Sequence, residues 1–284
     1  MLWINKANGR ETLMMFASDL DRTLIYSKKS MMLPDNQTVS FQLIEKKEEK
    51  EISFMTDHAI SLLQKLAKEM LFVPVTTRTI EQYERISLFH HSMKVPYAIT
   101  SNGGNILIDG KIDVDWNNRV VQSIKDQCLP KSNVLNAFSD ISHDEWVLKA
   151  READDLFCYF IIDPEKVPEC ELGDFRNWLS NQGWDSSLQG RKLYFVPKPV
   201  NKWRAVNYIK EREEKSFLFA AGDSQLDYDM LKMADMSYAP LHGELKYVIT
   251  NEKYSSNIKA TNSKGILASE ELLQNIILQI PVRI

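Results

Sequence analysis

The chain has 284 residues, of which 44% are hydrophobic and 26% charged, and this ordinary globular composition excludes a disordered, collagen-like or low-complexity protein. At about 150 residues per domain, the length indicates one large domain or two modest ones. The 35 basic and 39 acidic residues give a net charge of −4. Because nucleic-acid binding needs clustered Lys and Arg, this balance argues against nucleic acid as a partner.

Two further features of the sequence bear on the compartment of the protein. Its three cysteines, Cys128, Cys158 and Cys170, form no C-x-x-C pair, and their odd number leaves one unpaired in any intramolecular scheme. No apolar run approaches the roughly 18 residues of a transmembrane helix. The segment from Met1 to Thr12 is polar where a signal peptide is apolar. We therefore expect a cytoplasmic protein without a membrane partner.

The first predicted elements alternate between buried strands and an amphipathic helix. Residues 13–17 form a short apolar run that stops at a polar turn, as a strand buried on both faces of a parallel sheet does. Residues 38–55 alternate in hydrophobicity and predict a hairpin flap, with the charged residues 45–51 as its solvated tip. Residues 57–70 then predict a helix, and the apolar run 71–75 predicts a second buried strand.

A different pattern occupies the middle of the chain. Strands are predicted at residues 146–149, 156–162 and 192–196, and helices at 117–128, 131–141 and 173–182. Strands interleaved with helices over about 90 residues predict a small α+β domain with a core of its own. We therefore expect an inserted domain at residues 109–196, between two parts of one larger domain at residues 1–108 and 197–284.

After the insertion the helix and strand pattern of the larger domain resumes. Residues 202–212 predict a helix, and residues 216–221 predict a third buried strand that runs into Gly222, Asp223 and Ser224. Because parallel strands bind ligands beyond their carboxyl ends, the polar turns after the three strands should meet at one edge of the sheet. A single turn of this kind is also typical of an ordinary strand-to-helix loop, but three together indicate a site.

The side chains at this edge suit phosphoryl chemistry. Asp19 and Asp21 project to the same side of an extended chain, where their repulsion favours a divalent cation, and hard oxygen ligands favour Mg²⁺. Asp223 and Asp227 can complete such a metal site. A carboxylate beside Mg²⁺ can attack phosphorus, and a second can move protons to and from oxygen. Lys202 can supply the cation that a phosphoryl group needs.

Four segments resemble the motifs of the haloacid dehalogenase (HAD) superfamily. Residues 19–23 (DLDRT) resemble its D-x-D-x-T motif, although Arg22 stands where glycine is common. Thr76 resembles the hydroxyl residue of the second motif and Lys202 the lysine of the third. Residues 222–227 (GDSQLD) resemble the acidic fourth motif. The motifs occur in order, each after a predicted strand or at the start of a helix, which makes the match specific.

The place of the inserted domain extends the resemblance. It lies between the second and third motifs, and its α-β-β-α-β-β order resembles the caps of Cof-type and sucrose-phosphatase-like members. The resemblance implies an α/β fold, with a Rossmann-like parallel-sheet HAD core and a smaller α+β cap. It also implies a Mg²⁺-dependent phosphatase that hydrolyses a small phosphorylated metabolite, chiefly a sugar phosphate, through an aspartyl-phosphate.

The same resemblance implies a role for each motif residue. These roles are Asp19 as nucleophile and Mg²⁺ ligand, Asp21 as acid/base with its carbonyl on the metal, Thr76 and Lys202 on the phosphoryl group, Asp223 on Mg²⁺, and Asp227 as a ligand or a neighbour of the ligands. An Asp at position 21 is similar to the phosphatases and phosphomutases of the superfamily, whereas its ATPases carry Thr there.

Three further residues have more than one interpretation. The second motif reads T-T-R where Cof-type relatives usually have T-G-R, so that either Thr76 or Thr77 is the residue that holds the phosphoryl oxygen. Arg78 either contacts the substrate phosphate, caps the following helix or pairs with an acid. Asn102 either lines the pocket or belongs to a tight turn with the glycines that follow it.

Two other functions use the same residues. A phosphosugar mutase would return the phosphoryl group to its sugar, and a non-catalytic protein would bind a phosphometabolite without turnover. The intact set of Asp19, Asp21, Lys202 and Asp223 counts against the binding protein, which has little use for a nucleophile and an acid together. The favoured prediction is therefore a phosphatase whose partner is a small phosphorylated metabolite.

Overall fold

The structure is a computed structural model that describes residues 13–33, 38–245, 249 and 257–280. Segment 1–12, whose polar character argues against a signal peptide, lies outside the described residues. Within them, no helix combines the length and the apolar character that crossing a bilayer requires. The cysteines at positions 128, 158 and 170 are all free thiols.

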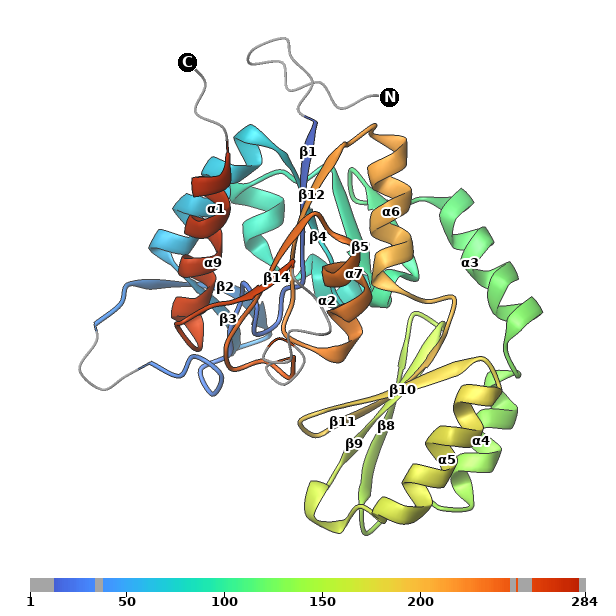
Figure 1. Cartoon of the computed structure of the whole chain (residues 1–284). Coiled ribbons are helices and arrows are strands. Elements are labelled where there is room, and N and C mark those ends of the chain that lie inside the picture. Colours follow the sequence, from blue (N-terminus) through green and yellow to red (C-terminus); the bar gives the residue numbers. More distant parts are fainter. Residues whose placement is uncertain (1–12, 34–37, 246–248, 250–256, 281–284) are drawn as a thin grey trace.

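A parallel five-stranded sheet forms the centre of the larger lobe (Figure 1). Its strands, from one edge to the other, are β14 (Ile258–Ala260), β13 (Met236–Ala239), β12 (Phe217–Ala221), β1 (Met14–Ser18) and β4 (Leu71–Pro74). In the register of the sheet, Ser18 of β1 is paired with Ala221 of β12 on one side and with Pro74 of β4 on the other. The three strands predicted from apolar runs therefore end side by side, as expected, and the polar turns that follow them meet at one edge.

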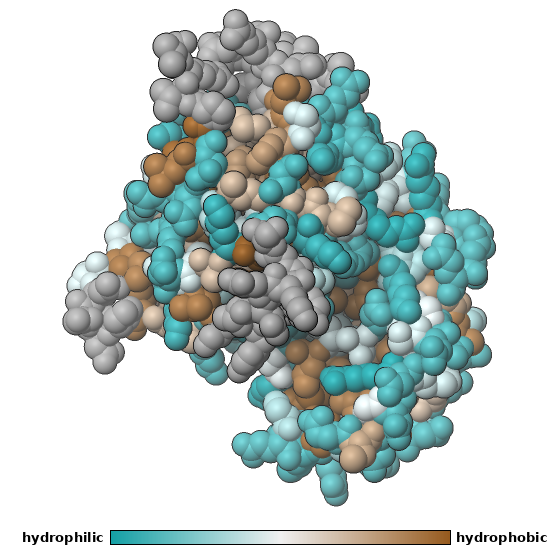
Figure 2. All heavy atoms as spheres, in the orientation of Figure 1, coloured by the Kyte–Doolittle hydropathy of each residue, from teal (hydrophilic) through white to brown (hydrophobic). Residues whose placement is uncertain are grey.

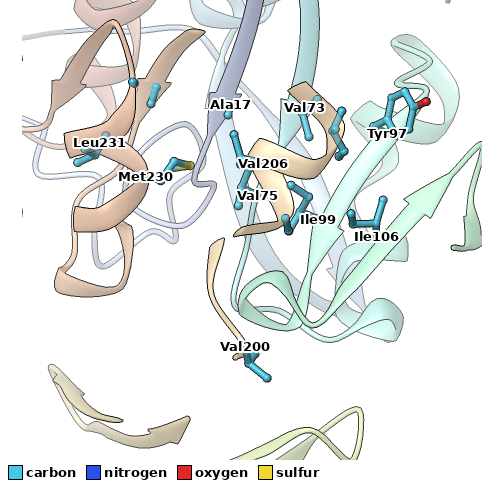
Figure 3. Packing of buried hydrophobic residues seen from close by; sticks show 14 of the residues in the cluster. Ala17, Val73, Val75, Tyr97, Ile99, Ile106, Val200, Val206, Met230 and Leu231 are labelled. Carbon is cyan, nitrogen blue, oxygen red and sulfur yellow. The ribbon is translucent and has the colours of Figure 1, made fainter. Parts of the chain in front are cut away.

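Helices cover both faces of this sheet (Figure 1). One face packs against α1 (Asp57–Glu69) and α9 (Ile266–Gln279), and the other against α6 (Lys202–Arg212) and α7 (Tyr228–Met233). Successive side chains of a strand point to opposite faces of the sheet. Because helices cover both faces, a strand carries apolar residues on both of them and forms a continuous apolar run. Figure 3 shows Val73, Val75 and Ile99 gathered around Val206 on the α6 side.

Helix α1 begins where the sequence pattern places it. The hydroxyl of Thr56 accepts a hydrogen bond from the Ala59 N–H at 3.0 Å, which satisfies one of the free donors of the first turn. Ile60, Leu63 and Leu66 lie at three-residue spacing and are buried against the sheet. Burial of such side chains stabilises the layer by roughly 1.5–3 kcal/mol each.

The hairpin before α1 differs from its prediction at the tip. Strands β2 (Phe41–Lys47) and β3 (Lys50–Thr56) continue through most of the charged segment 45–51, so the turn itself is short. Glu45, expected at a solvated tip, is instead almost fully buried. Its burial is compensated by two arginines, described below, which a linear charge pattern does not reveal.

A small antiparallel sheet extends the core beyond β4. It consists of β5 (Tyr97–Thr100), β6 (Asn105–Ile108) and β7 (Lys111–Ile112), and Val75 is bridged to Ile99 at its junction with the main sheet. Between β4 and β5 lie α2 (Ile80–Glu84) and a π-helical turn, η1 (Leu88–Ser92). A 3₁₀ turn, η2 (Ser101–Gly103), joins β5 to β6.

The smaller lobe has its own antiparallel sheet and core (Figure 1). Its elements are α4 (Lys131–Ser139), β8 (Val147–Ala153), β9 (Phe157–Ile162), η3 (Pro164–Lys166), α5 (Glu169–Asn181), β10 (Trp184–Gln189) and β11 (Lys192–Pro197), with sheet order β10-β11-β9-β8. Strand β10 is the third strand of the expected α-β-β-α-β-β order, but the sequence pattern gives no range for it, because its sequence WDSSLQ is mostly polar. On the face shown in Figure 2, hydrophilic residues cover most of both lobes.

Two parts of the inserted segment also pack on the larger lobe. Helix α3 (Val114–Gln127) places Trp116 and Val120 in the core cluster beside α6. The turn between β8 and β9 places Leu156 in the same cluster, against Gly104. We propose that residues 109–196 form the cap and that these contacts hold it to the core.

Candidate active site

The turn after β1 presents Asp19 at the carboxyl edge of the sheet. The Asp19 N–H donates to the Ala221 carbonyl at 2.8 Å, which fixes the turn to β12. The Leu20 carbonyl accepts from the N–H groups of Thr23, Leu24 and Ile25, so that the chain folds back on itself. The Thr23 hydroxyl in turn donates to Asp19 Oδ2 at 3.1 Å.

Lys202 reaches the same point from the first turn of α6. Asn201 caps this helix by accepting from the Arg204 N–H at 3.2 Å. The Lys202 ammonium lies 2.6 Å from Asp19 Oδ1 and 2.6 Å from Asp227 Oδ1. Burial lowers the pKa of Lys202, but the two carboxylates outweigh it and hold the amine protonated.

Asp227 is fixed by the turn after β12. Its Oδ2 accepts from the N–H of Ser224 at 2.9 Å and from the Ser224 hydroxyl at 2.8 Å. Gly222 is required beside it, since a Cβ at that position would stand 2.4 Å from the Asp227 Cβ. The glycine of the fourth motif therefore allows the close approach of this carboxylate.

Asp223 completes an acidic cluster. One carboxylate oxygen each from Asp19, Asp223 and Asp227 lie within 4.8 Å of one another, and all three residues are buried. Burial, and then the charges of Asp19 and Asp227, raise the pKa of Asp223 well above its ordinary value. Burial likewise raises the pKa of Asp19 to about 7, although Lys202 opposes the shift. Such a set of carboxylates is suited to a hard divalent cation, which relieves their repulsion.

Arg22 lies at the rim of this cluster. Its Nε is 3.5 Å from Asp223 Oδ2, and its Nη2 donates to the His242 carbonyl at 3.2 Å. The Arg22 backbone is left-handed, with φ of 63°, a conformation that glycine adopts at less cost. The turn therefore retains the backbone shape typical of glycine while carrying a cation.

The second motif contributes a buried hydroxyl. Thr76 is fully buried, and its Oγ1 accepts from the Arg78 N–H at 3.1 Å. Thr77 is partly exposed and, together with Tyr194 of β11, lines the cavity beside the acidic cluster. The two candidates for holding the phosphoryl oxygen thus occupy different positions.

Arg78 pairs with acids, which is one of the three roles considered from sequence. Its Nε and Nη2 donate to the two oxygens of Asp21 at 2.7 and 2.8 Å, and its Nη1 donates to Glu45 at 2.7 Å. Desolvation raises the pKa of Asp21, but the charge and hydrogen bonds of Arg78 outweigh it, so this pKa is lowered. The Asp21 side chain is half exposed, whereas that of Arg78 is nearly buried.

Asn102 lies in the turn η2, close to Lys202. It is buried, its φ is 58°, and its Nδ2 donates to the Val200 carbonyl at 3.1 Å. The neighbouring Gly103 makes room for this packing, since a Cβ there would be 2.3 Å from the Asn201 carbonyl oxygen. The structure thus combines the tight turn with a contact to the chain that leads into α6.

A cavity of about 370 Å³ opens over these groups, between the two lobes. The core side of its lining includes Asp21, Thr77 and Asp223, and the inserted domain contributes Lys192 and Tyr194. An adjoining cavity of about 250 Å³ is lined by Arg78 and Glu45 as well. Lys192 and Tyr194 could not be identified from the sequence, because no local motif marks a side chain that reaches the site from another domain.

The sequence model of the family described as sucrose-6F-phosphate phosphohydrolase matches residues 12–239. A comparison with curated proteins gives no match. Among solved structures, the sucrose-phosphatase from Synechocystis sp. PCC6803, in complex with sucrose and phosphate, is similar with a TM-score of 0.65 and 14% identity. The similarity covers 95% of this chain and 98% of that chain.

Two other phosphatases share the fold. The HAD subclass IIB sugar phosphatase BT4131 has a TM-score of 0.54 at 13% identity, over 93% of this chain and 98% of that chain. The HAD phosphatase BT1666 from Bacteroides thetaiotaomicron has a TM-score of 0.52 at 13% identity, over 95% and 96% of the two chains. The chain belongs to the sucrose-6F-phosphate phosphohydrolase family of the HAD superfamily, and it is a phosphatase that acts on phosphate monoesters, with a Rossmann-like core and a cap.

Proposed function

We propose that the protein hydrolyses the phosphate monoester of a small sugar, with Mg²⁺, through a covalent aspartyl-phosphate on Asp19. The observation that carries this proposal is the buried contact of Lys202 with both Asp19 and Asp227. These residues lie beside Asp223, which lines the cavity between the lobes. A nucleophile, a cation and a set of metal ligands thus converge on one point. A protein that only binds phosphate has no need of this combination.

The acidic cluster supports Mg²⁺ as the cofactor. Asp19, Asp223 and Asp227 offer oxygen ligands at compatible separations, and the carbonyl of Asp21 is the fourth candidate ligand. A bound Mg²⁺ neutralises the carboxylates and the oxygens of the phosphoryl group, which lets the two approach each other. The raised pKa of Asp19 and Asp223 in the metal-free protein agrees with a site that requires a cation.

In the first step, an Asp19 carboxylate oxygen attacks phosphorus while the ester P–O bond breaks. Lys202 and the Thr76 hydroxyl stabilise the charge on the equatorial oxygens. The leaving sugar oxygen takes a proton from Asp21. The bound phosphate ester is itself negative, so its approach raises the proton affinity of Asp21 above that in the free protein.

In the second step, Asp21 takes a proton from water, and the water oxygen attacks the phosphorus of the aspartyl-phosphate. The bond between Asp19 and phosphorus breaks, and inorganic phosphate leaves. Asp21 regains in this step the proton that it gave up in the first. Arg78 favours the carboxylate form of Asp21, which is the form that can accept this proton.

The inserted domain is proposed to select the substrate. Lys192 and Tyr194 reach the cavity from β11, and Thr77 and Arg22 face it from the core. Hydroxyl and charged groups around a cavity of about 370 Å³ suit a polyhydroxylated ligand of sugar size. A cap over the site also keeps bulk water away from the transferring phosphoryl group.

A substrate panel tests the proposal. The wild-type protein is assayed for inorganic phosphate release from sucrose 6F-phosphate, several hexose phosphates and an aryl phosphate, with Mg²⁺ or with excess chelator. We expect Mg²⁺-dependent release that is lost in Asp19→Asn while the fold persists. Formation of an isomeric sugar phosphate in place of free phosphate would indicate a mutase instead. Tight binding of a sugar phosphate with no product over hours would indicate a binding protein.

A further inference from the structure

The hairpin β2–β3 carries an irregularity at Glu45. The pairing passes from Leu43 opposite Phe54 to Glu45 opposite Ser53, so that Ile44 is an extra residue on its strand. In consequence Ile44 and Glu45 are both buried, although neighbours on a regular strand face opposite sides. Bulges of this kind turn a side chain in a new direction and are common beside active sites.

The Glu45 carboxylate is turned onto two arginines inside the protein. Its Oε2 accepts from Arg78 Nη1 and from the Ser53 hydroxyl, each at 2.7 Å, and its Oε1 accepts from Arg85 Nε at 3.2 Å. The side chain has no exposed surface. A buried carboxylate is costly unless its charge and lone pairs are satisfied, so these contacts restrict Glu45 to one arrangement.

Arg78 transmits this arrangement to Asp21. The guanidinium group is planar, so the contact of Nη1 with Glu45 fixes the plane in which Nε and Nη2 meet Asp21. Ser53 adds a further contact, since its hydroxyl oxygen accepts from Nη2 at 3.1 Å. Glu45 and Asp21 thus hold one guanidinium from two sides, one in the interior and the other at the cavity.

We propose that Glu45 is a positioning residue, which acts through Arg78 to orient the Asp21 carboxyl toward the leaving oxygen of the substrate. The inference rests on the proposed function, in which Asp21 supplies the proton for that oxygen. Half of the Asp21 side chain is exposed, so little else in the described contacts restricts its rotation. A displacement of about 1 Å at a reacting group is enough to lower a rate about 100-fold.

Substrates with different leaving groups separate this role from a general structural one. A sugar alkoxide is a strong base and must be protonated as it leaves, whereas 4-nitrophenolate is a good leaving group without a proton. A misplaced acid therefore lowers kcat/KM for the sugar phosphate and changes kcat/KM for 4-nitrophenyl phosphate much less. Damage to the fold, the metal site or the nucleophile lowers both values together.

The test compares Glu45→Gln with Glu81→Gln. The control removes the exposed acid that binds the other side of Arg85 and does not touch Arg78. For Glu45→Gln we expect kcat/KM to fall about 10- to 100-fold with the sugar phosphate and by less than about 3-fold with 4-nitrophenyl phosphate. Glu81→Gln should stay within about 2-fold of wild type on both substrates.

Ser53→Ala provides a second, milder variant that keeps every charge. Removing its hydroxyl loosens both Glu45 and Arg78, and we expect the same selective loss on a smaller scale. Equal losses on the two substrates, or no loss in either variant, would overturn the proposal. Should Glu45→Gln fail to fold, the Ser53→Ala result decides alone. A wild-type protein that hydrolyses neither ester contradicts the proposed function, and with it this inference.

Discussion

The ammonium of Lys202 lies 2.6 Å from Oδ1 of Asp227, and both side chains are shielded from solvent. The same ammonium is bound to Asp19, so that one cation compensates two buried carboxylates. This arrangement explains how the acidic cluster is stable before a metal binds. It also means that Lys202 supports the fold as well as the proposed chemistry.

Replacement of Lys202 with Met should therefore destabilise the metal-free protein. Removal of one partner leaves Asp19 and Asp227 buried without compensation, and we expect the free energy of unfolding to fall by about 3–5 kcal/mol. Urea denaturation measures the change. Lys198→Met is the control, because that lysine is exposed and its ammonium donates to Ser180 rather than to a buried carboxylate. Mg²⁺ should recover part of the loss in Lys202→Met. A loss no larger than that of the control would contradict this account.

Gly222 is predicted to tolerate no side chain. A Cβ would stand 2.4 Å from the Asp227 Cβ, so Gly222→Ala must displace the loop that holds Asp223 and Asp227. We expect a lower melting temperature and weaker binding of Mg²⁺, measured as an increase in the Mg²⁺ concentration for half-maximal rate. The matched control is Gly173→Ala in α5, where the added methyl group meets open space. Equal behaviour of the two variants would exclude the steric argument.

Asp154 is predicted to tie the inserted domain to the core. From the turn between β8 and β9, its Oδ2 accepts from the Ile80 N–H at 3.0 Å and from Asn105 Nδ2 at 3.2 Å, and it also binds the Ser101 hydroxyl. Asp154→Asn keeps the left-handed turn but weakens these bonds, at a cost of about 1–3 kcal/mol.

Hydrogen–deuterium exchange of the β8–β9 turn measures the effect of Asp154→Asn. We expect faster exchange in residues 153–157 than in wild type. Asp155→Asn serves as the control, since Asp155 is exposed in the same turn and also has a left-handed backbone. Unchanged exchange in Asp154→Asn would show that apolar packing of the turn is sufficient to hold it.

His242 should make stability fall in acid. Its Nδ1 accepts from the Gly265 N–H at 3.0 Å, so Nε2 carries the proton that is donated to the Arg22 carbonyl at 3.0 Å. Burial lowers the pKa of His242 from 6.5 to about 4. The unfolded chain therefore binds this proton first as the pH falls, and the stabilisation present above pH 6.5 is lost between pH 6.5 and about 4.

His242→Gln isolates this effect, because glutamine does not titrate. The difference in unfolding free energy between wild type and variant should shrink as the pH is lowered through this range. Urea denaturation at a series of pH values measures the difference, which removes the contribution of the other titrating groups. A difference that stays constant with pH would rule out the shifted pKa.

Much of the core could be predicted from sequence because its signals are local. The apolar runs that became β1, β4 and β12 are continuous, since both faces of the sheet are covered by helices. Because the strands are parallel, the polar turns that follow them must meet at one edge of the sheet. The convergence of Asp19, Asp223 and Asp227 follows from this topology, and the structure places them together.

Features that depend on contacts between distant segments could not be predicted. Glu45 lies in a charged run that resembles a solvated turn, and its burial depends on Arg78 and Arg85 arriving from another element. Strand β10 is polar and is recognised only by its pairing with β11. Lys192 reaches the cavity from the inserted domain, and no spacing in the sequence relates it to the core motifs.

The measurement that tests the central claim most directly is a rapid acid quench of the wild-type protein during turnover of a ³²P-labelled sugar phosphate with Mg²⁺. We expect covalently bound label that peptide mapping assigns to Asp19, that disappears as substrate is exhausted, and that is absent from Asp19→Asn. Phosphate release by the wild-type protein with no covalent label, or with label on another residue, would contradict the account.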